Sequence, residues 1–365
     1  MSYPPTNVGA ITIITYRFIF VVLTTILLQG CTPNQSESTD KSSPITIANQ
    51  GSFFIGGITK KYGATADNGD ITVNQMYVQY QMPLKSEHFP IVMIHGCCLS
   101  SKSWETTPDG RMGWNEYFLR KNRPVYLVDQ VSRARSGFDP SIMGAVRAGV
   151  LPPGELPGIL TFSHQLAWRL FRFGPVYGET FKNGQFPIES VDNLYKQMIP
   201  DLNALLDTDN PTWMNLALLA KKLDGVILMG HSESGFFPQH AALIDTDNIR
   251  GIISIELDCP ANLTEVQVDA LAKVPTLIIF GDYLGNVPDD PGNWVGALAG
   301  CEALAKRIND ADGNTQVIHL PQLGVYGNSH MLMQDRNNLD VADIILTWID
   351  ETIEKRKVPI INKIK

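Results

Sequence analysis

The stretch that decides the fold is Val226-Ile-Leu-Met-Gly-His-Ser-Glu-Ser-Gly-Phe236. Its first four residues form a short apolar run, which is typical of a strand covered on both faces of a sheet. Small and polar residues follow, and then a segment with the apolar spacing of a helix, 236–244. The stretch therefore predicts a strand, a turn and a helix, the repeating unit of a parallel sheet.

Short apolar runs recur on both sides of this stretch. Each is bounded by turn residues, as in parallel strands buried on both faces, and they stand at 91–94, 125–128, 252–255, 275–280 and 317–320. The run 71–82 instead alternates apolar and polar residues, which predicts an antiparallel strand at the edge of the sheet. Helical spacing at 291–308 and 339–353 completes a βαβα order and predicts an α/β fold.

One interval, 137–220, is too long for a single connecting helix between two strands. We expect it to hold an inserted cap over the sheet. Its aromatic residues include Trp168, Phe171 and Phe173. Such residues more often pack a helix, but in a cap over a sheet they also favour a site for an apolar or cyclic group.

The N-terminal region has the features of an export signal. An apolar run at 18–28 is short for a membrane-spanning helix but typical of a secretory signal. Leu28-Gln-Gly-Cys31 resembles the lipobox of bacterial lipoproteins, in which cleavage before the cysteine leaves that cysteine lipidated. We therefore predict a signal peptide at 1–30 and a lipid anchor on Cys31 of an exported, membrane-anchored bacterial lipoprotein, periplasmic or at the cell surface. An ordinary signal or a single anchoring helix is the alternative.

Composition limits what the remainder of the chain, after the signal peptide, can be. The polar segment 31–45 predicts a flexible tether, 46–354 the folded domain and 355–365 a solvated basic tail. The chain is 44% hydrophobic and 18% charged, which excludes a wholly disordered protein. A formal net charge of -8 offers no basic surface to a phosphate backbone, so no nucleic-acid partner is expected.

The cysteines predict disulfides. With Cys31 reserved for lipid, four of the five remain, namely Cys97, Cys98, Cys259 and Cys301. An even number in an exported protein predicts two bridges. The simplest pairings join the adjacent cysteines and join Cys259 to Cys301, whereas crossed bridges or four free thiols are the alternatives.

The central motif carries a resemblance. Gly230-His-Ser-Glu-Ser-Gly235 resembles the nucleophile elbow of the α/β-hydrolase superfamily, a sharp turn that needs small residues two positions before and after the nucleophile. Here those residues are Gly230 and Ser234, with Ser234 replacing the usual glycine. The resemblance implies an α/β-hydrolase fold, with a mostly parallel sheet flanked by helices, and Ser232 as the nucleophile.

A serine nucleophile needs a base and an acid that orients the base. The superfamily places the histidine after the last strand, where this chain has His330. Three carboxylates compete for the acid, namely Asp282, Glu256 and Asp258, and all preserve the order serine, acid, histidine. Asp282 occupies the commonest superfamily location.

Further motifs resemble a narrower group, a family of secreted bacterial carboxylesterases. They are His95-Gly-Cys-Cys98, Trp104-Glu-Thr-Thr-Pro-Asp-Gly-Arg-Met-Gly-Trp114, Asp129-Gln130 with Arg133-Ala-Arg-Ser136, and Gly327-Asn-Ser-His-Met-Leu-Met-Gln-Asp-Arg-Asn-Asn338. The resemblance implies a disulfide between the adjacent cysteines beside the oxyanion hole, a second disulfide, and a glutamate at the end of the sixth strand as the acid. On that basis Glu256 is chosen over Asp282.

An oxyanion hole needs two backbone N–H donors, and Glu233 and Cys97 fit these places. We therefore expect a serine carboxylic ester hydrolase that acts through an acyl-enzyme on a small-molecule ester with an apolar or cyclic group. No cofactor or metal is expected, because neither His-x-x-x-His nor paired Cys-x-x-Cys motifs occur. A lactonase, an amidase, a thioesterase or an inactive surface binding lipoprotein is the alternative.

Overall fold

The computed structural model describes residues 43–63, 69–202 and 209–355. The predicted signal peptide, the lipidation site at Cys31, most of the tether and nearly all of the tail lie outside the described residues. Among the helices that are described, none is both long enough and apolar enough to cross a membrane.

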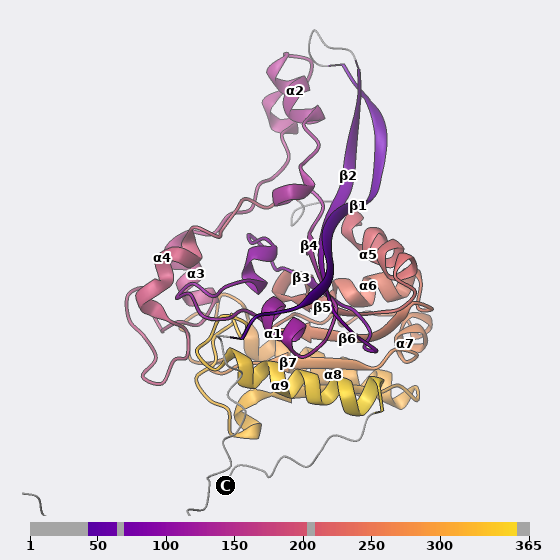
Figure 1. Cartoon of the computed structure of the whole chain (residues 1–365). Coiled ribbons are helices and arrows are strands. Elements are labelled where there is room, and N and C mark those ends of the chain that lie inside the picture. The colour runs from indigo at the N-terminus through magenta and orange to yellow at the C-terminus, as the bar shows by residue number, and fades with distance from the viewer. Residues whose placement is uncertain (1–42, 64–68, 203–208, 356–365) are drawn as a thin grey trace, which may run out of the picture. The chain divides into compact units, whose positions relative to one another are not determined.

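One sheet organises the folded part of the chain (Figure 1). Its strand order is β1-β2-β4-β3-β5-β6-β7-β8, and every neighbouring pair from β4 to β8 runs parallel. The strands are β1 (Ile47–Tyr62), β2 (Gly69–Pro83), β3 (Ile91–Ile94), β4 (Val125–Asp129), β5 (Val226–His231), β6 (Ile249–Ile255), β7 (Thr276–Phe280) and β8 (Thr315–His319). The predicted α/β class with a mostly parallel sheet is confirmed.

Helices cover both faces of this sheet. They are α1 (Trp114–Arg120), α5 (Pro211–Lys222), α6 (Phe237–Ile244), α7 (Glu265–Leu271), α8 (Trp294–Asp310) and α9 (Asn338–Trp348), the last continued by a π-helical turn, Ile349–Ile353. Successive residues of a strand point to opposite faces. In β3, Ile91 and Met93 therefore join an apolar cluster with α1 and α9, while Val92 and Ile94 join a second cluster with α5 to α8.

The edge of the sheet differs from the prediction. The alternating run at 71–82 is indeed an antiparallel strand, β2, but β2 pairs with β4 on one side and with β1 on the other. The edge strand on this side of the sheet is β1, which the sequence pattern did not predict. None of its residues is buried, so it has no buried face to impose a hydrophobic period.

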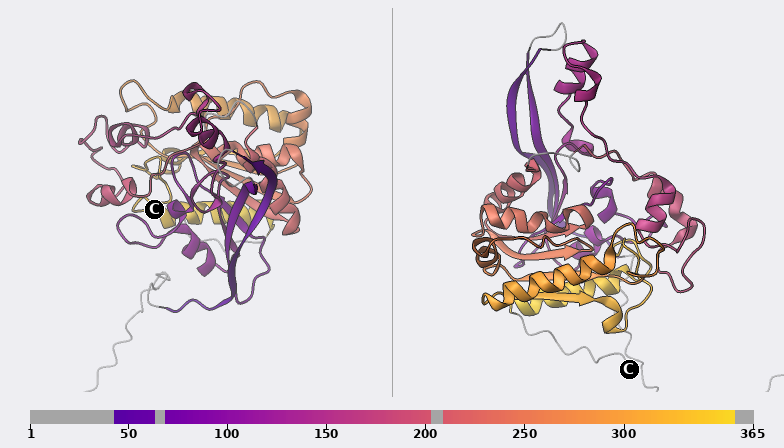
Figure 2. Two further views of the ribbon diagram at one scale, coloured as in Figure 1. Left: turned by 90° about the horizontal axis from the view of Figure 1, so that it is seen from above. Right: turned by 180° about the vertical axis from the view of Figure 1, so that it is seen from behind.

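The connection from β4 to β5 contains the inserted segments. Before α5 the chain forms α2 (Ser141–Arg147), α3 (His164–Leu170) and α4 (Val191–Tyr195). The helix α2 stands beside the far end of the β1–β2 hairpin (Figures 1 and 2), where Phe138 and Met143 share a pocket with Tyr62. Most of the helix α5 lies in the predicted cap interval 137–220, but α5 packs on the sheet through Leu216 and Leu219. The division into domains stays a prediction.

A disulfide joins Cys259, which follows β6, to Cys301 in α8 across a sequence separation of 42. Closing a loop of this length restricts the unfolded chain by about 4 kcal/mol in the entropic model. We therefore expect the double substitution Cys259→Ser, Cys301→Ser to lower the free energy of unfolding by about that amount. Urea denaturation measures the change, and an unaltered midpoint would contradict this role.

Candidate active site

Ser232 stands at the turn between β5 and a 3-10 helix, Ser232–Phe236, which leads into α6. Its φ of 57° lies in the left-handed region, which is uncommon for a non-glycine residue. The turn is too tight for a side chain at position 230. A Cβ on Gly230 would lie 2.0 Å from the carbonyl oxygen of Ser234, so glycine is required.

The serine that replaces the usual glycine of the turn has a structural role. Ser234 Oγ accepts a hydrogen bond from the His231 amide at 3.0 Å and lies 2.9 Å from the carbonyl oxygen of Ile94 in β3. The backbone packs closely at Gly235, the residue after Ser234. A Cβ on Gly235 would lie 2.3 Å from Leu257 Cβ. The position after the nucleophile that has no space for a side chain is therefore Gly235, one residue beyond Ser234.

His330 lies in the loop after β8, and its side chain is fully buried. Its Nδ1 is 3.1 Å from Glu256 Oε2. Within the described part of the chain, Nε2 has no hydrogen-bond partner, and no hydrogen bond to Ser232 is formed. Aromatic rings fix the imidazole, since its centroid is 5.4 Å from that of Phe171 and 4.4 Å from that of Trp294.

Glu256 directly follows β6 and is fully buried. Its Oε1 accepts hydrogen bonds from the Gly281 amide at 2.5 Å and from Arg172 Nη2 at 2.6 Å. Oε2 is left to face His330. The structure therefore brings Glu256, and neither of its competitors, to the histidine.

Asp282 and Asp258 are used differently. Asp282 Oδ2 accepts the Gly327 amide at 2.8 Å, and Oδ1 accepts the Tyr283 amide at 2.7 Å. Asp282 thus holds the start of the loop that carries His330, without a recorded contact to the imidazole among the described residues. Asp258 is exposed to solvent.

Burial and charge set the protonation states of this pair. Burial alone would raise the pKa of Glu256, but the Arg172 guanidinium and the His330 contact outweigh it and lower the pKa to about 2. Burial lowers the pKa of His330, and the Glu256 carboxylate opposes that change. At neutral pH the pair is therefore an ionised carboxylate beside a neutral imidazole with a free Nε2 acceptor.

The loop after β3 lies against Ser232. A Cβ on Gly96 would be 2.9 Å from Ser232 Cβ, so the backbone that leads to Cys97 passes directly beside the nucleophile candidate. Glu233 is the second residue of its 3-10 helix, and amides at a helix start have no acceptor within the helix. The amides of Cys97 and Glu233 are thus both near Ser232.

Cys97 and Cys98 depart from the expected bridge. Both are free cysteines in the structure, with their Sγ atoms 2.6 Å apart. That separation is longer than the roughly 2.05 Å of a covalent disulfide. The backbone is still constrained, because Cys98 has a φ of 59° and its carbonyl accepts the Ile199 amide at 2.9 Å. The adjacent bridge is therefore not confirmed, whereas the Cys259–Cys301 bridge is.

Comparison with known proteins identifies the family. A solved bacterial esterase is 44% identical to this chain, with a TM-score of 0.81, over 86% of this chain and 98% of the esterase. The chain belongs to this bacterial esterase family. A probable secreted lipase, phiG, of Fungal sp. (strain ATCC 74256) is 24% identical over 375 residues, 91% of this chain and 97% of the lipase. No protein-family model matches.

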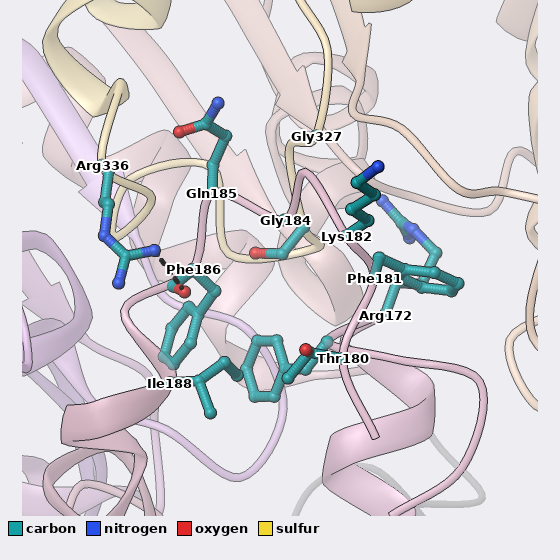
Figure 3. A pocket seen from close by; sticks show the side chains of 12 residues that line it. Arg172, Thr180, Phe181, Lys182, Gly184, Gln185, Phe186, Ile188, Gly327 and Arg336 are labelled. Atoms are coloured by element: carbon teal, nitrogen blue, oxygen red, sulfur yellow. Dashed lines mark hydrogen bonds between the residues drawn. The ribbon is translucent and has the colours of Figure 1, made fainter. Parts of the chain in front are cut away.

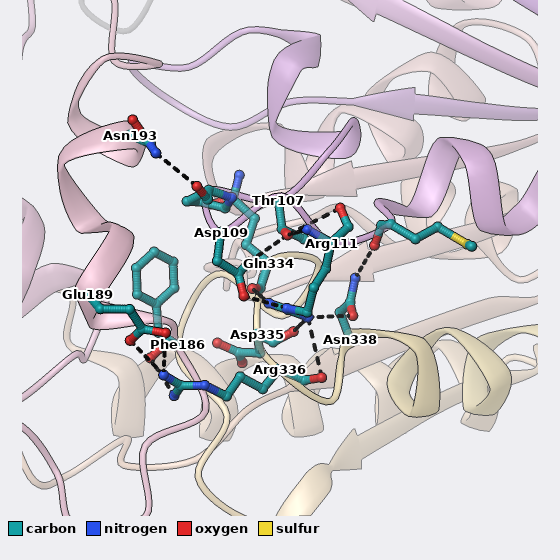
Figure 4. A network of polar contacts seen from close by, with 12 residues as sticks. Thr107, Asp109, Arg111, Phe186, Glu189, Asn193, Gln334, Asp335, Arg336 and Asn338 are labelled. Atoms are coloured by element: carbon teal, nitrogen blue, oxygen red, sulfur yellow. Dashed lines mark hydrogen bonds and ion pairs between the residues drawn. The ribbon is translucent and has the colours of Figure 1, made fainter. Parts of the chain in front are cut away.

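This chain, an esterase of that family, therefore has the α/β-hydrolase fold and is a carboxylesterase-type hydrolase, as its sequence predicted. Several charged residues around the site were not predicted individually, although they lie in the motifs that carried the resemblance. Arg111 is one. Its Nη2 donates to the Gln334 carbonyl at 2.8 Å and its Nη1 to the Asp335 carbonyl at 2.8 Å (Figure 4). Arg111 thereby clamps the chain shortly after His330.

Asp335 in the same network is buried and has no cationic side-chain partner among its recorded hydrogen bonds in the described ranges. Its carboxylate accepts from the Ser329 amide at 2.8 Å, the Ser329 hydroxyl at 2.7 Å and Asn328 Nδ2 at 3.0 Å. Burial outweighs these hydrogen bonds and raises the pKa of Asp335 to about 7.

This raised pKa predicts a pH dependence of stability. Because its pKa is raised in the folded state, protonated Asp335 favours the folded protein. This contribution to stability is fully present below about pH 4, where Asp335 is protonated in both states, and it is lost as the pH rises through about 7. We expect Asp335→Asn to gain stability relative to the wild type as the pH rises from about 4 to about 7, by up to about 1.4 kcal/mol per pH unit, with a constant difference above that. Urea titrations at several pH values test this, and a pH-independent difference would contradict it.

A second buried cluster lies beneath the turn at Ser232. Arg133 Nη2 pairs with Glu233 Oε2 at 3.0 Å and also with Asp201. Gln130 Nε2 lies 3.3 Å from the same Glu233 oxygen. Burial raises the pKa of Glu233, and Arg133 opposes the increase. The Arg133 and Gln130 side chains thus tie Glu233, whose amide borders Ser232, to the loop after β4.

Potential metal ligands gather in two places in the described ranges, Cys97 with Cys98 and Asp201, and His88 with Asp350 and Glu354. Arginines already pair with the carboxylates of both groups, through Arg133 and Arg123 respectively. These carboxylates therefore already have cationic partners.

A cavity of about 220 Å³ opens beside the loop that carries His330 (Figure 3). Phe173 lines it together with Phe181 and Phe186. Of the other aromatic residues expected in the cap, Phe171 stacks on His330, and Trp168 is buried with its Nε1 donating to the Glu179 carbonyl at 2.9 Å. The cap aromatics therefore serve packing as well as a cavity wall.

Proposed function

We propose that the esterase hydrolyses carboxylic esters through an acyl-enzyme, with Ser232 as nucleophile, His330 as base and Glu256 as the acid. The observation that carries the proposal is the 3.1 Å contact between Glu256 Oε2 and His330 Nδ1. It is supported by the left-handed turn at Ser232, which follows a parallel strand and precedes a helix.

The chemistry follows from these groups. Ser232 Oγ attacks the ester carbonyl carbon as His330 Nε2 takes the hydroxyl proton. The tetrahedral intermediate collapses, the C–O bond to the alcohol breaks, and His330 returns the proton to the leaving alcohol. Water then attacks the acyl-enzyme by the same route and releases the carboxylic acid with free Ser232. Glu256 stabilises the imidazolium that forms in each step.

The oxyanion of the intermediate would bind the amides of Cys97 and Glu233. A disulfide between Cys97 and Cys98 would stiffen the first of these donors, and this bridge is part of the proposal. Thiol titration of the unfolded, unreduced protein counts the free cysteines and decides whether the bridge forms.

If the bridge positions the donor, Cys98→Ser lowers kcat by roughly 10²-fold, the loss expected when one oxyanion donor is misaligned. The melting temperature should change little, because the loop that this bridge closes is minimal. An unchanged kcat in a folded variant would remove the stiffening role from the proposal.

The relatives support a small-molecule ester as substrate, and the secreted relative supports export. An apolar or cyclic group on the substrate would fit the aromatic cap. We also propose that cleavage after residue 30 leaves Cys31 lipidated, so that residues 31–45 tether the domain to a membrane. Detergent partitioning of the wild type and of Cys31→Ala, expressed in bacteria, tests the anchor.

A fluorophosphonate probe tests the nucleophile directly, because it forms a covalent adduct with an activated serine. We expect the adduct on the peptide that contains Ser232, and we expect no labelling in Ser232→Ala or after heat denaturation. Labelling of another serine, or none in a folded protein, would overturn the assignment.

A further inference from the structure

We infer that Arg172, supplied by the insertion between β4 and β5, is a positioning residue that holds Glu256 with one carboxylate oxygen aimed at His330. The inference rests on the proposed function and extends it from the three triad residues to the cap. Arg172 lies two residues beyond α3, far in sequence from the strands that carry the triad.

The guanidinium bridges two segments at the carboxyl edge of the sheet. Its Nη2 donates to Glu256 Oε1 at 2.6 Å, and its Nε donates to the Asp282 carbonyl at 2.8 Å. Glu256 Oε1 also accepts the Gly281 amide, so this oxygen is fully engaged. Two donors on one oxygen fix the rotation of the carboxylate and leave Oε2 for His330.

The residues next to Arg172 act on the same histidine. The Leu170 carbonyl accepts Trp294 Nε1 at 3.1 Å, and the Phe171 carbonyl accepts the His330 amide at 2.9 Å. The Arg172 guanidinium lies 5.2 Å from the centre of the Trp294 ring. Three consecutive residues of the insertion therefore touch the base, the acid or the ring that packs on the base.

The backbone supports a positional requirement. Arg172 has a φ of 57°, a region that favours glycine, yet an arginine with a fully buried side chain occupies it. Such strain persists where the surrounding structure needs the conformation. Here the left-handed backbone at Arg172, just beyond the end of α3, directs the Arg172 side chain to Glu256.

Charge gives the contact a second effect. The titratable and charged groups around the pair come from several elements, with Arg172 from the insertion, His231 from β5, and Asp335 and His330 from the loop after β8. A buried carboxylate without a cation takes up a proton more readily. Removing the Arg172 charge therefore raises the pKa of Glu256, and it also removes a cation that lowers the pKa of His330.

The higher pKa of Glu256 and the higher pKa of His330 shift the pH profile of activity in the same direction. Catalysis needs ionised Glu256 and neutral His330, so a higher pKa for either group moves the acid limb of kcat/KM to higher pH. A purely structural role for Arg172 predicts a loss of folded protein or of kcat without this shift.

The experiment compares Arg172→Gln and Arg172→Lys with Arg169→Gln, a matched control in α3 whose guanidinium donates to the Pro288 carbonyl and has no recorded contact with Glu256 or His330 in the described ranges. Hydrolysis of p-nitrophenyl acetate is followed from pH 5 to 10, with kcat and KM determined separately. For Arg172→Gln we expect kcat to fall roughly 10²-fold with little change in KM, and the acid limb to rise by about one pH unit.

Arg172→Lys keeps the charge and should retain the acid limb of the wild type, while Arg169→Gln should leave both readouts unchanged. An unshifted acid limb in folded Arg172→Gln would overturn the inference, whether or not kcat falls. So would equal shifts in the Lys and Gln variants.

If Arg172→Gln does not fold, Arg172→Gly relieves the positive φ, and added guanidinium ion at millimolar concentration supplies the missing cation. Recovery of kcat with guanidinium but not with sodium supports the inference, and no recovery overturns it. Activity that persists in Ser232→Ala would instead overturn the proposed function. Loss in Ser232→Ala and Glu256→Gln, with normal Arg172→Gln, would overturn the positioning role alone.

Discussion

Ser232→Ala is expected to lower kcat for ester hydrolysis by roughly 10⁴-fold or more, the scale seen when a serine nucleophile is removed. Alanine has no oxygen to form the acyl-enzyme, and His330 Nε2 then has no proton to accept. Steady-state hydrolysis of p-nitrophenyl esters, from acetate to a long acyl chain, measures the loss. The wild-type series also reports the size of the acyl site.

Ser163→Ala is a matched control for this experiment. Ser163 is exposed, and its Oγ accepts the Leu166 amide at 3.1 Å at the start of α3, without a recorded contact to the site in the described ranges. It should retain the wild-type kcat. Hydrolysis at wild-type rates by a folded Ser232→Ala would contradict the nucleophile assignment.

Glu256→Gln is expected to lower kcat by roughly 10³-fold to 10⁴-fold, because a neutral amide stabilises the imidazolium far less than a carboxylate does. A glutamine placed between Arg172 and His330 can also turn its amide nitrogen toward one of them and lose the hydrogen bond. The same ester assay measures the change, and circular dichroism checks that the fold is intact.

Asp282→Asn is the comparison that separates the two acids. The asparagine still has one oxygen to accept the Gly327 amide, which Asp282 accepts at 2.8 Å, so we expect less than about a tenfold loss of kcat. A larger loss in Asp282→Asn than in Glu256→Gln would reverse the assignment of the acid.

The parallel strands could be predicted from sequence because burial on both faces gives them continuous apolar runs. The runs at 91–94 and 125–128 fall within β3 (Ile91–Ile94) and β4 (Val125–Asp129), with boundaries that agree to one residue. The edge strand β1 (Ile47–Tyr62) could not be found this way, since its pairing with β2 depends on backbone hydrogen bonds that any side chain permits.

The residues of the site likewise fall into those that the sequence predicts and those that it does not. Ser232 is detectable because the turn at its position demands small neighbours in sequence, and a Cβ on Gly230 has no space. The contact between Arg172 and Glu256 joins residues 84 apart and leaves no local pattern. The choice of Glu256 over Asp282 came from a family resemblance, and the different hydrogen bonds of the two carboxylates emerge only in three dimensions.

The contact between Arg172 and Glu256 affects how this esterase can diversify. An insertion over a sheet is usually free to vary, because loops on a rigid scaffold tolerate change. Here the insertion also delivers a cation to the carboxylate of Glu256, directly after β6. Grafting the corresponding insertion from a relative that has no arginine at this point is therefore expected to alter turnover together with selectivity, because the graft would separate Arg172 from the carboxylate that it holds.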